Sequence, residues 1–310
     1  MLSPADAVVA AYLILTAALI GAFTDRVSLW WVLLPAHLLV VLMIVLLARW
    51  PGAALAPGSD WGAGAGSAAV PVRGLSMLRF WYPLLLIPFT FRELSYLIPL
   101  IRRHDLDHQL AAVDYRLFGT DPVVWLSKSA WPPLTLLLQL SYLTYYFLPI
   151  VLSVILWRRG EFGRFHFFAF IVVLGFYASY IGYIAVPAIG PRFFLDSQVE
   201  PFQGASVQFI RQTLNSAEGL TRDCFPSGHT ELTLLVLYCA RRFEKRAFWV
   251  MLPPGLALII STVYLRYHYA IDVIAGAVLA VAILALSEWL YNVMGGRLSA
   301  LTASGIDVES

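Results

Sequence analysis

Long apolar stretches recur along almost the whole chain, and they limit its fold more than any other feature. Eight of them approach or exceed the roughly 20 residues that a helix needs to cross a bilayer. Backbone N–H and C=O groups must be satisfied internally in lipid, so such segments cross as helices. The sequence therefore predicts an all-α fold, a polytopic transmembrane helical bundle. The predicted spans are residues 8–24, 28–48, 80–101, 134–157, 165–186, 227–240, 248–265 and 269–291.

The composition agrees with a bilayer environment and excludes several other classes. Apolar residues make up 60% of the chain and charged residues only 13%, whereas a soluble chain carries about a quarter charged residues. The net charge of +2 excludes a basic nucleic-acid-binding protein, so no nucleic-acid partner is expected. Cys224 and Cys239 form no C-x-x-C pair, which indicates neither a disulfide scaffold nor a cysteine zinc site. We expect no metal and no cofactor.

Four regions follow from the spacing of these stretches. Residues 1–50 are predicted to form an accessory transmembrane helix pair. No Lys or Arg precedes the first stretch and another apolar run follows at once, so we interpret it as a helix and not as a signal peptide. Residues 51–79 are rich in Gly, Ala and Pro and are interpreted as a link. Residues 80–293 are predicted to hold a six-helix catalytic core, and residues 294–310 a polar tail.

The orientation in the membrane follows from two short basic turns. Cytoplasmic loops accumulate Lys and Arg, and the turns after the fourth and sixth spans contain Arg158, Arg159, Arg164, Arg241, Arg242, Lys245 and Arg246. We therefore expect both termini in the cytoplasm and residues 187–226 and 266–268 on the other side. Only two lysines occur, which hints at a bacterial source. This interpretation predicts a bacterial inner membrane protein with its active site on the periplasmic face.

Three polar motifs adjoin predicted helix ends on that outer side. They are Gly190-Pro191-Arg192 after the fifth span, Cys224-Phe225-Pro226-Ser227-Gly228-His229 at the start of the sixth, and Arg266-Tyr267-His268 with Asp272 at the start of the eighth. The sixth and seventh spans carry the chain in and back out. All three motifs therefore share one membrane depth and can meet.

The second motif and the arginines suit a phosphate group. Pro226 fits a first helical turn and Gly228 permits close backbone approach, so the N–H groups of this helix start, with Ser227, can cradle an anion. The guanidinium of Arg192 matches phosphate oxygens, and Arg266 adds a second charge near His268.

The two histidines suit covalent catalysis. His268 and Asp272 are spaced i, i+4 and share a helix face, where the carboxylate can accept a hydrogen bond from one imidazole nitrogen. The other nitrogen is then free to attack phosphorus, and His229 can protonate the departing oxygen. The alternative is structural: a helix-start histidine, a buried His268–Asp272 pair that satisfy each other, and Arg192 as an interfacial cation.

These motifs resemble the type 2 phosphatidic acid phosphatase superfamily. The resemblance rests on Pro226-Ser227-Gly228-His229 followed about forty residues later by His268-x-x-x-Asp272, and it covers residues 80–291. It implies a helical membrane enzyme that works through a phosphohistidine without metal, with Arg192 as the first-motif residue. The residues around the motifs and the stretch Asp114–Pro122 are more similar to the branch of inositol phosphorylceramide synthases.

Two positions depart from the superfamily pattern. Ala185 stands where that pattern has a lysine, and Thr262 where it has an arginine. The loss favours the transferase branch, with a phospholipid donor and a lipid alcohol as acceptor. Water as acceptor would make the protein a lipid phosphatase. A carrier or scaffold that kept the pocket without turnover is a third hypothesis.

Other charged residues are assigned less specific roles. Arg92 and Glu93 lie inside a predicted span, where they either line a headgroup passage or form an internal ion pair. Residues 104–128 are predicted to lie at the membrane interface. We interpret Asp105, Asp107 and Asp114 as its solvated face, with a magnesium or calcium site as the alternative.

Overall fold

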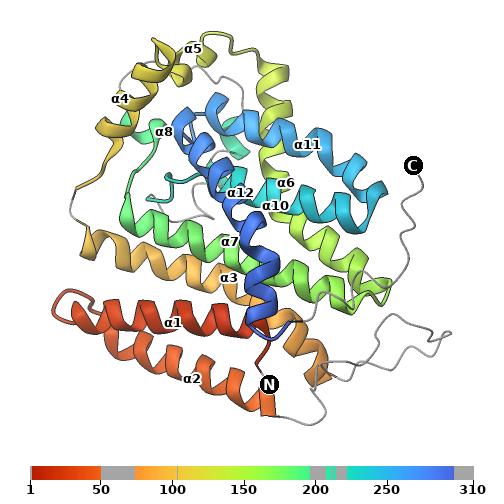
Figure 1. The fold of residues 1–310 in the computed structure, drawn as a ribbon. Helices are drawn as coiled ribbons and strands as arrows, with labels where there is room; N and C mark the ends of the chain where they lie inside the picture. The colour runs from red at the N-terminus through yellow and green to blue at the C-terminus, as the bar shows by residue number, and fades with distance from the viewer. Residues whose placement is uncertain are drawn as a thin grey trace. The chain divides into compact units, whose positions relative to one another are not determined.

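The computed structural model describes residues 2–49, 74–102, 104–195, 207–210, 212–213 and 222–296. These residues form helices and loops and contain no strand (Figure 1). The helices are α1 (Pro4–Ala22), α2 (Trp30–Arg49), α3 (Gly74–Ile101), α4 (Asp107–Phe118), α5 (Pro122–Ser127), α6 (Pro132–Arg158), α7 (Phe162–Ala185), α8 (Pro191–Phe194), α10 (Gly228–Phe243), α11 (Lys245–Tyr264) and α12 (Ala270–Val293).

Seven of the described helices are long and apolar enough to cross a membrane: α1, α2, α3 from Met77, α6, α7, α11 and α12. The prediction of a polytopic helical membrane protein is confirmed. The remaining predicted span, 227–240, is the sixth along the chain and forms the helix α10, which has only 16 residues. Three of its polar side chains, Thr230, Glu231 and Thr233, are buried. Protein contacts surround this helix, so it does not need the length or apolarity of a helix that faces lipid.

The predicted link ends earlier than its composition indicates. The helix α3 begins at Gly74, so the last six residues of the stretch 51–79 are helical and the prediction is wrong there. Residues 51–73 lie outside the described part of the chain, as do residues 297–310 of the predicted tail.

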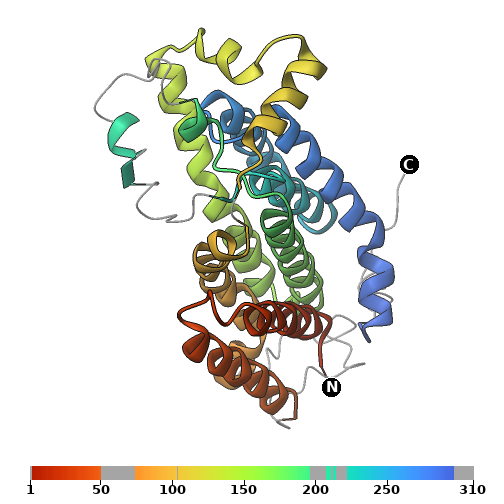
Figure 2. The same cartoon turned by 90° about the vertical axis from the view of Figure 1, so that its left-hand side faces the viewer.

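Contacts divide the chain into two compact units. Unit 1 comprises residues 1–87, 151–174 and 283–310. Within it, α1 and α2 lie side by side (Figures 1 and 2). The buried guanidinium of Arg79 in α3 pairs with Asp6 of α1 at 3.2 Å and donates to the carbonyl of Leu47 in α2. Tyr82 also donates to Asp6. These buried polar contacts connect both accessory helices to the first turns of α3.

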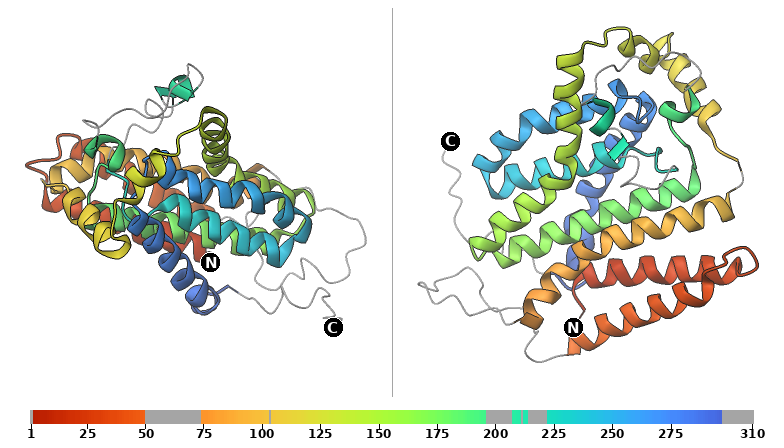
Figure 3. Two further views of the ribbon diagram at one scale, coloured as in Figure 1. Left: turned by 90° about the horizontal axis from the view of Figure 1, so that it is seen from above. Right: turned by 180° about the vertical axis from the view of Figure 1, so that it is seen from behind.

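Unit 2 comprises residues 88–150 and 175–282 and contains all three motifs. Within it, α10 and α11 lie side by side (Figures 1 and 3). They approach closely at Gly255, where an added Cβ would lie 3.1 Å from the Thr233 side chain. The predicted interfacial segment forms α4 and α5. Both present large apolar side chains outward, including Tyr115, Phe118 and Trp125, as expected at a headgroup boundary.

Candidate active site

The three motifs converge at one end of unit 2. The backbone N–H of Ser227, which precedes α10, donates to the carbonyl of Asp272 in α12 at 3.0 Å. Gly190, which precedes α8, has a φ of 83°. An added Cβ there would lie 2.9 Å from the Tyr267 carbonyl and 3.3 Å from Cys224 Sγ. Glycine is therefore required at this position both for its backbone angle and for the close approach of the other two motifs.

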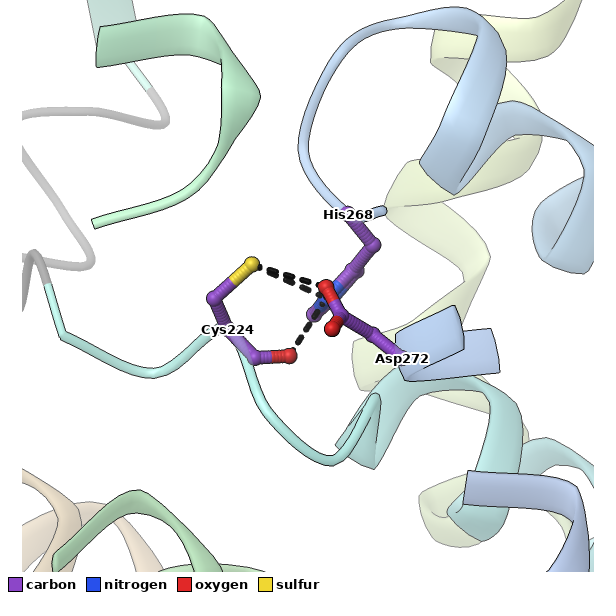
Figure 4. Close-up of side chains that lie close together, drawn as sticks. All are labelled: Cys224, His268 and Asp272. Atoms are coloured by element: carbon purple, nitrogen blue, oxygen red, sulfur yellow. Dashed lines mark hydrogen bonds and ion pairs between the residues drawn. The ribbon is translucent and has the colours of Figure 1, made fainter. Parts of the chain in front are cut away.

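His268 is held in one tautomer. Its Nδ1 lies 2.8 Å from the carbonyl oxygen of Cys224. A carbonyl only accepts hydrogen bonds, so Nδ1 carries the proton and Nε2 keeps its lone pair. Asp272 Oδ2 lies 3.5 Å from the same nitrogen, so the carboxylate predicted as the direct acceptor is the more distant of the two (Figure 4).

Asp272 is fully buried in the first turn of α12. Its Oδ2 accepts the backbone N–H of Tyr269 at 2.8 Å and the thiol of Cys224 at 2.9 Å. A carboxylate in a first helical turn also interacts favourably with the helix dipole. Asp272 is thus a buried charge that connects the loop before α12 to the loop before α10.

His229 faces His268 directly. Its Nδ1 lies 3.2 Å from His268 Nε2, and because His268 Nε2 is unprotonated, His229 Nδ1 is the donor of this contact. The ring packs against Tyr142 and Tyr145 of α6, with centroids 4.6 and 4.1 Å away. Its Nε2 is buried and has no hydrogen-bond partner among the described residues. In the neutral ring this nitrogen keeps its lone pair and can accept a hydrogen bond from a hydroxyl group of a ligand.

Ser227 and Gly228 shape the start of α10. The Ser227 hydroxyl accepts the backbone N–H of Thr230 at 3.3 Å and so caps the helix. An added Cβ at Gly228 would lie 2.4 Å from the hydroxyl oxygen of Tyr183. The predicted role of these two residues in phosphate binding stays a prediction, because the contacts observed are those of a capped and tightly packed helix start.

Arg192 and Arg266 both lie buried in unit 2. The guanidinium of Arg192 lies 4.7 Å from the ring centroid of Tyr267, a cation–π arrangement. Tyr267 stacks on Tyr142 with centroids 4.3 Å apart, and Tyr142 stacks on His229. A column of rings thus connects this arginine to the histidine of α10, and Arg192 is within electrostatic range of His229.

Arg266 occupies an unusual backbone conformation. Its φ is 66°, which is uncommon for a residue with a side chain. One guanidinium nitrogen donates to the hydroxyl of Ser127 at the end of α5, at 3.1 Å. Non-glycine residues in this region persist where their surroundings determine the conformation. Here the backbone turn between α11 and α12 and the contact with α5 supply those surroundings.

The aspartates of α4 correct the interpretation of a solvated face. Asp107 is buried and accepts the backbone N–H groups of Ile189 and Gly190 at 3.0 and 2.9 Å. It also accepts the hydroxyl of Tyr269 at 3.0 Å. Its carboxylate therefore connects α4 to the first motif and to the loop before α12. The alternation of charged and apolar residues along α4 did not reveal this role. The groups that donate to the Asp107 carboxylate are backbone N–H groups about 80 residues further along the chain.

Asp114 acts in the same way two turns further along the same face of α4. It is buried and accepts the backbone N–H groups of Ala270 and Ile271 at 2.8 and 2.7 Å, which satisfies the open N–H groups at the start of α12. Burial raises the pKa of its carboxyl to about 6, and these two hydrogen bonds oppose the shift. Asp105 is half-exposed and forms a two-bond ion pair with Arg222 at 2.6 and 3.0 Å.

Arg92 and Glu93 point in different directions from α3. Arg92 is exposed on the helix surface, whereas Glu93 is buried. An internal ion pair was one hypothesis for both residues, and the exposure of Arg92 contradicts it for that residue. The headgroup passage stays a prediction.

The positions that depart from the superfamily pattern hold uncharged groups. Ala185 ends α7. Thr262 is fully buried, its hydroxyl donates to the Ile259 carbonyl at 2.7 Å, and its own carbonyl accepts the N–H groups of Tyr267 and His268. Thr262 therefore supports the loop that carries His268 and supplies no positive charge.

One set of three candidate metal ligands occurs among the described residues, and it is part of this site: Cys224, His268 and Asp272. The Cys224 thiol donates a hydrogen bond to the Asp272 carboxylate, and His268 Nδ1 donates one to the Cys224 carbonyl. A metal ion there would have to displace both protons.

Comparison with known proteins agrees with this geometry. A family model described as the PAP2 superfamily matches residues 108–286, which is more than half of the chain. The matched region runs from α4 into α12 and includes all three motifs. Searches among curated proteins and among solved structures found no match.

Proposed function

The chain belongs to the PAP2 superfamily, which makes it a membrane enzyme of the lipid phosphatase or phosphotransferase type, and from this premise we propose a specific reaction. The protein moves a phosphoryl or phospho-headgroup group from a phospholipid to an alcohol acceptor through a phosphohistidine at His268. The observation that carries the proposal is the 3.2 Å contact between His268 Nε2 and His229 Nδ1. It aligns a lone pair with a proton donor in a buried site.

In the first step the lone pair of His268 Nε2 attacks phosphorus and the bond from phosphorus to the lipid oxygen breaks. That oxygen takes a proton from His229 and leaves as diacylglycerol or another alcohol. Nδ1 keeps its proton, so the phosphorylated ring is positive. The Cys224 carbonyl and the Asp272 carboxylate stabilise this charge.

In the second step His229 accepts the proton of the acceptor hydroxyl, whose oxygen attacks phosphorus. The bond from phosphorus to Nε2 breaks and the lone pair returns to His268. The buried guanidinium groups of Arg192 and Arg266 stabilise the negative charge on the phosphoryl oxygens. They supply the positive charge that a metal ion supplies in other phosphoryl transferases.

The substrate must separate the two rings before it reacts. In-line displacement places phosphorus between the nucleophile and the proton donor, and 3.2 Å is too short for this. His268 is held by the Cys224 carbonyl, whereas His229 contacts aromatic faces on its sides. His229 is therefore the ring that moves, within the slot between Tyr142 and Tyr145.

The alcohol acceptor is favoured over water by the uncharged residues at Ala185 and Thr262. With two fewer positive charges, the site has less capacity for the dianionic phosphate monoester that a lipid phosphatase binds. A phosphodiester carries one negative charge and needs fewer cations.

We further propose that this site lies on the periplasmic face of a bacterial inner membrane with both termini in the cytoplasm. The basic turn between α10 and α11 supports this orientation. It lies at the opposite end of α10 from His229, about 21 Å away, because Phe243 is 14 residues beyond His229 and each residue adds about 1.5 Å.

A direct test uses the purified protein in micelles with phosphatidylinositol labelled at phosphorus, with and without ceramide as the lipid alcohol. We expect label on His268, located by mass spectrometry, and label in a new lipid only when ceramide is present. Inorganic phosphate released from phosphatidic acid at a rate independent of ceramide would favour the phosphatase alternative. His268→Gln should abolish both labels, and unchanged cellular activity of that variant would favour a carrier or scaffold.

A further inference from the structure

Gln139 is a buried amide of α6 that the mechanism above does not use. Only 1% of its surface is exposed. Its side-chain nitrogen Nε2 donates to the backbone carbonyl of Val207 at 3.2 Å. Its oxygen Oε1 is buried and has no hydrogen-bond partner among the described residues. A buried acceptor without a partner is rare in folded proteins, and a ligand, an ion or a water molecule completes such a group.

The contact with Val207 fixes which way the amide of Gln139 points. A carbonyl oxygen only accepts hydrogen bonds, so the Gln139 atom that faces the Val207 carbonyl must be the nitrogen. The flipped amide would bring two acceptor oxygens to the same short distance, which the hydrogen-bond network excludes. Oε1 therefore keeps its lone pairs available for a donor that is not part of this amide contact.

Gln139 lies beside the column of rings in the candidate active site. Gln139 and Tyr142 are spaced i, i+3 and so share a face of α6. Val207, which accepts from Gln139, packs in one hydrophobic cluster with Tyr142 and Tyr267. Tyr142 in turn stacks on His229, with ring centroids 4.6 Å apart. Gln139 is therefore only about 4.5 Å along the helix axis from the tyrosine that contacts the proposed proton donor.

The charge of this region limits which group can donate to Oε1. The buried guanidinium of Arg192 lies 4.7 Å from the ring centroid of Tyr267, in the same column. A positive charge there disfavours an ammonium group nearby and favours an uncharged donor. A hydroxyl group is an uncharged donor that the alcohols of the proposed reaction can carry in addition to the oxygen bonded to phosphorus.

We propose that Gln139 is a specificity-determining residue whose Oε1 accepts a hydrogen bond from a second hydroxyl group of the substrate. This inference rests on the proposed function, which brings phosphorus to His268 and the alcohol bonded to it into the same region. The hydroxyl belongs either to the headgroup of the donor lipid or to the acceptor alcohol. A substrate without this hydroxyl leaves Oε1 unpaired, and its kcat/KM is lower for that reason.

The experiment removes the hydroxyl from the substrate and the amide from the protein, separately and together. The donors are phosphatidylinositol, whose headgroup carries free hydroxyls, and phosphatidylethanol, whose headgroup carries none. The acceptors are ceramide, with a second hydroxyl, and hexadecanol, with only the reacting one. Gln139→Met has a similar volume and no amide. For each combination, kcat/KM is measured in micelles from the release of diacylglycerol labelled in its acyl chain.

This design isolates the contact between Oε1 and the substrate. Gln139→Met also removes the hydrogen bond to Val207, but that loss is common to both members of each substrate pair and cancels from their ratio of kcat/KM. Ser141→Ala is the matched control. Ser141 is also a buried polar residue of α6, and its hydroxyl donates within the helix to the Leu137 carbonyl at 2.9 Å.

We expect Gln139→Met to reduce the preference for the substrate with the hydroxyl by about tenfold, as for the loss of one hydrogen bond to a buried group. A reduction in the donor pair assigns the hydroxyl to the headgroup, and a reduction in the acceptor pair assigns it to the lipid alcohol. Ser141→Ala should keep the wild-type ratios. Unchanged ratios in both pairs for Gln139→Met would overturn the inference, as would an equal reduction in Ser141→Ala.

The two proposals fail in different ways, because binding of the lipids can be measured without turnover. In the His268→Gln protein, the rise in the midpoint temperature of unfolding reports the affinity for each lipid. If wild-type His268 never carries a phosphoryl group, yet adding Gln139→Met removes the preference of this protein for phosphatidylinositol or ceramide, only the proposed function fails. If transfer proceeds and the ratios stay unchanged, only the role of Gln139 fails. Gln139→Leu replaces Gln139→Met if that variant does not fold, and the same reduction is expected.

Discussion

At the scale of single residues, the site depends on backbone groups as much as on side chains. A carbonyl oxygen orients the ring of His268. The carboxylates of Asp107 and Asp114 accept hydrogen bonds from backbone N–H groups. These backbone partners fix the distances between the loops that connect the helices. Because they are not side chains, a sequence motif does not identify them. The geometry of the candidate site therefore depends on segments that lie far apart in the chain.

The role of His229 as a proton donor predicts a dependence on the leaving group. His229→Gln should lower transfer from a phospholipid by about 10²–10⁴-fold, the usual contribution of general acid catalysis. The p-nitrophenolate group of a p-nitrophenyl phosphodiester leaves without protonation. The rate of phosphohistidine formation from this donor should therefore fall much less. Rapid-quench labelling of His268 with both donors measures the difference.

His104→Gln is the control for this experiment, because His104 is exposed and outside the motifs. An equal loss with both donors would contradict the acid role. It would indicate that His229 only shapes the pocket.

The contact between Gly228 and Tyr183 predicts a compensating pair of substitutions. Gly228→Ala places a Cβ 2.4 Å from the Tyr183 hydroxyl and should destabilise the fold by about 1–3 kcal/mol through overpacking. Tyr183→Phe removes that oxygen, after which the nearest ring carbon lies 3.7 Å away. The double variant should regain much of the loss.

Thermal unfolding in detergent, combined in a double-mutant cycle, measures this coupling. Additive effects of the two substitutions would show that the hydroxyl is not what excludes a side chain at position 228. The activity of the double variant separately reports whether α10 begins in the correct place.

At the scale of elements, α4 holds two of the loops that form the candidate active site. This helix lies outside the spans and exposes Tyr115 and Phe118. It also carries Asp107 and Asp114, which are buried and lie seven residues apart, so two turns along one face. One carboxylate holds the start of α8 and the other the start of α12, so α4 sets the separation of the first and third motifs.

Asp114 predicts a pH-dependent stability. Its carboxyl has a pKa of about 6 in the folded protein against 3.8 for the ordinary group, so the folded state binds the proton more tightly. The contribution of Asp114 to stability is complete below about pH 4 and is lost as the pH rises through about 6. Asp114→Asn cannot ionise and should flatten this part of the profile.

The midpoint temperature of unfolding, measured from pH 4 to 7 in detergent, tests this. Asp25→Asn is the control, because Asp25 is an exposed carboxylate in the turn after α1. A wild-type profile with the same slope as that of Asp114→Asn in this window would contradict the assignment.

At the scale of the whole molecule, the proposed orientation predicts which introduced cysteines a membrane-impermeant thiol reagent can label from outside the cell. Lys128 follows α5 near the site and Arg246 lies in the basic turn after α10, and both are exposed. In intact bacterial cells with a permeable outer membrane, a membrane-impermeant thiol reagent should label Lys128→Cys at once. Arg246→Cys should react only after the inner membrane is opened.

The native cysteines cause little background in this experiment, because Cys224 and Cys239 are both buried. The wild-type protein should stay unlabelled in both conditions. Labelling of Arg246→Cys in intact cells, without labelling of Lys128→Cys, would reverse the orientation.

The sequence by itself determined the membrane-spanning helices and the three motifs. Apolar runs of sufficient length admit only a helix in lipid, so seven of the eight predicted spans coincide with helices that are long and apolar enough to cross a membrane, with an earlier start for α3. The predicted span 227–240 forms α10, a helix of only 16 residues. The i, i+4 spacing of His268 and Asp272 predicted that the two side chains lie close together, and they do at 3.5 Å. The shared helix face was wrong, because α12 begins at Ala270 and His268 lies in the loop before it. These features depend on residues that are close together in the chain, so the order of residues is enough to predict them.

Only the tertiary structure decided which partners these residues have. It replaced Asp272 by the Cys224 carbonyl as the nearer acceptor for His268, and it buried Asp107 and Asp114, which an alternating pattern had assigned to solvent. Each of these contacts joins groups more than 40 residues apart, and most involve backbone atoms that every residue carries. Because identical backbone groups occur at every position, the order of side chains alone could not select them.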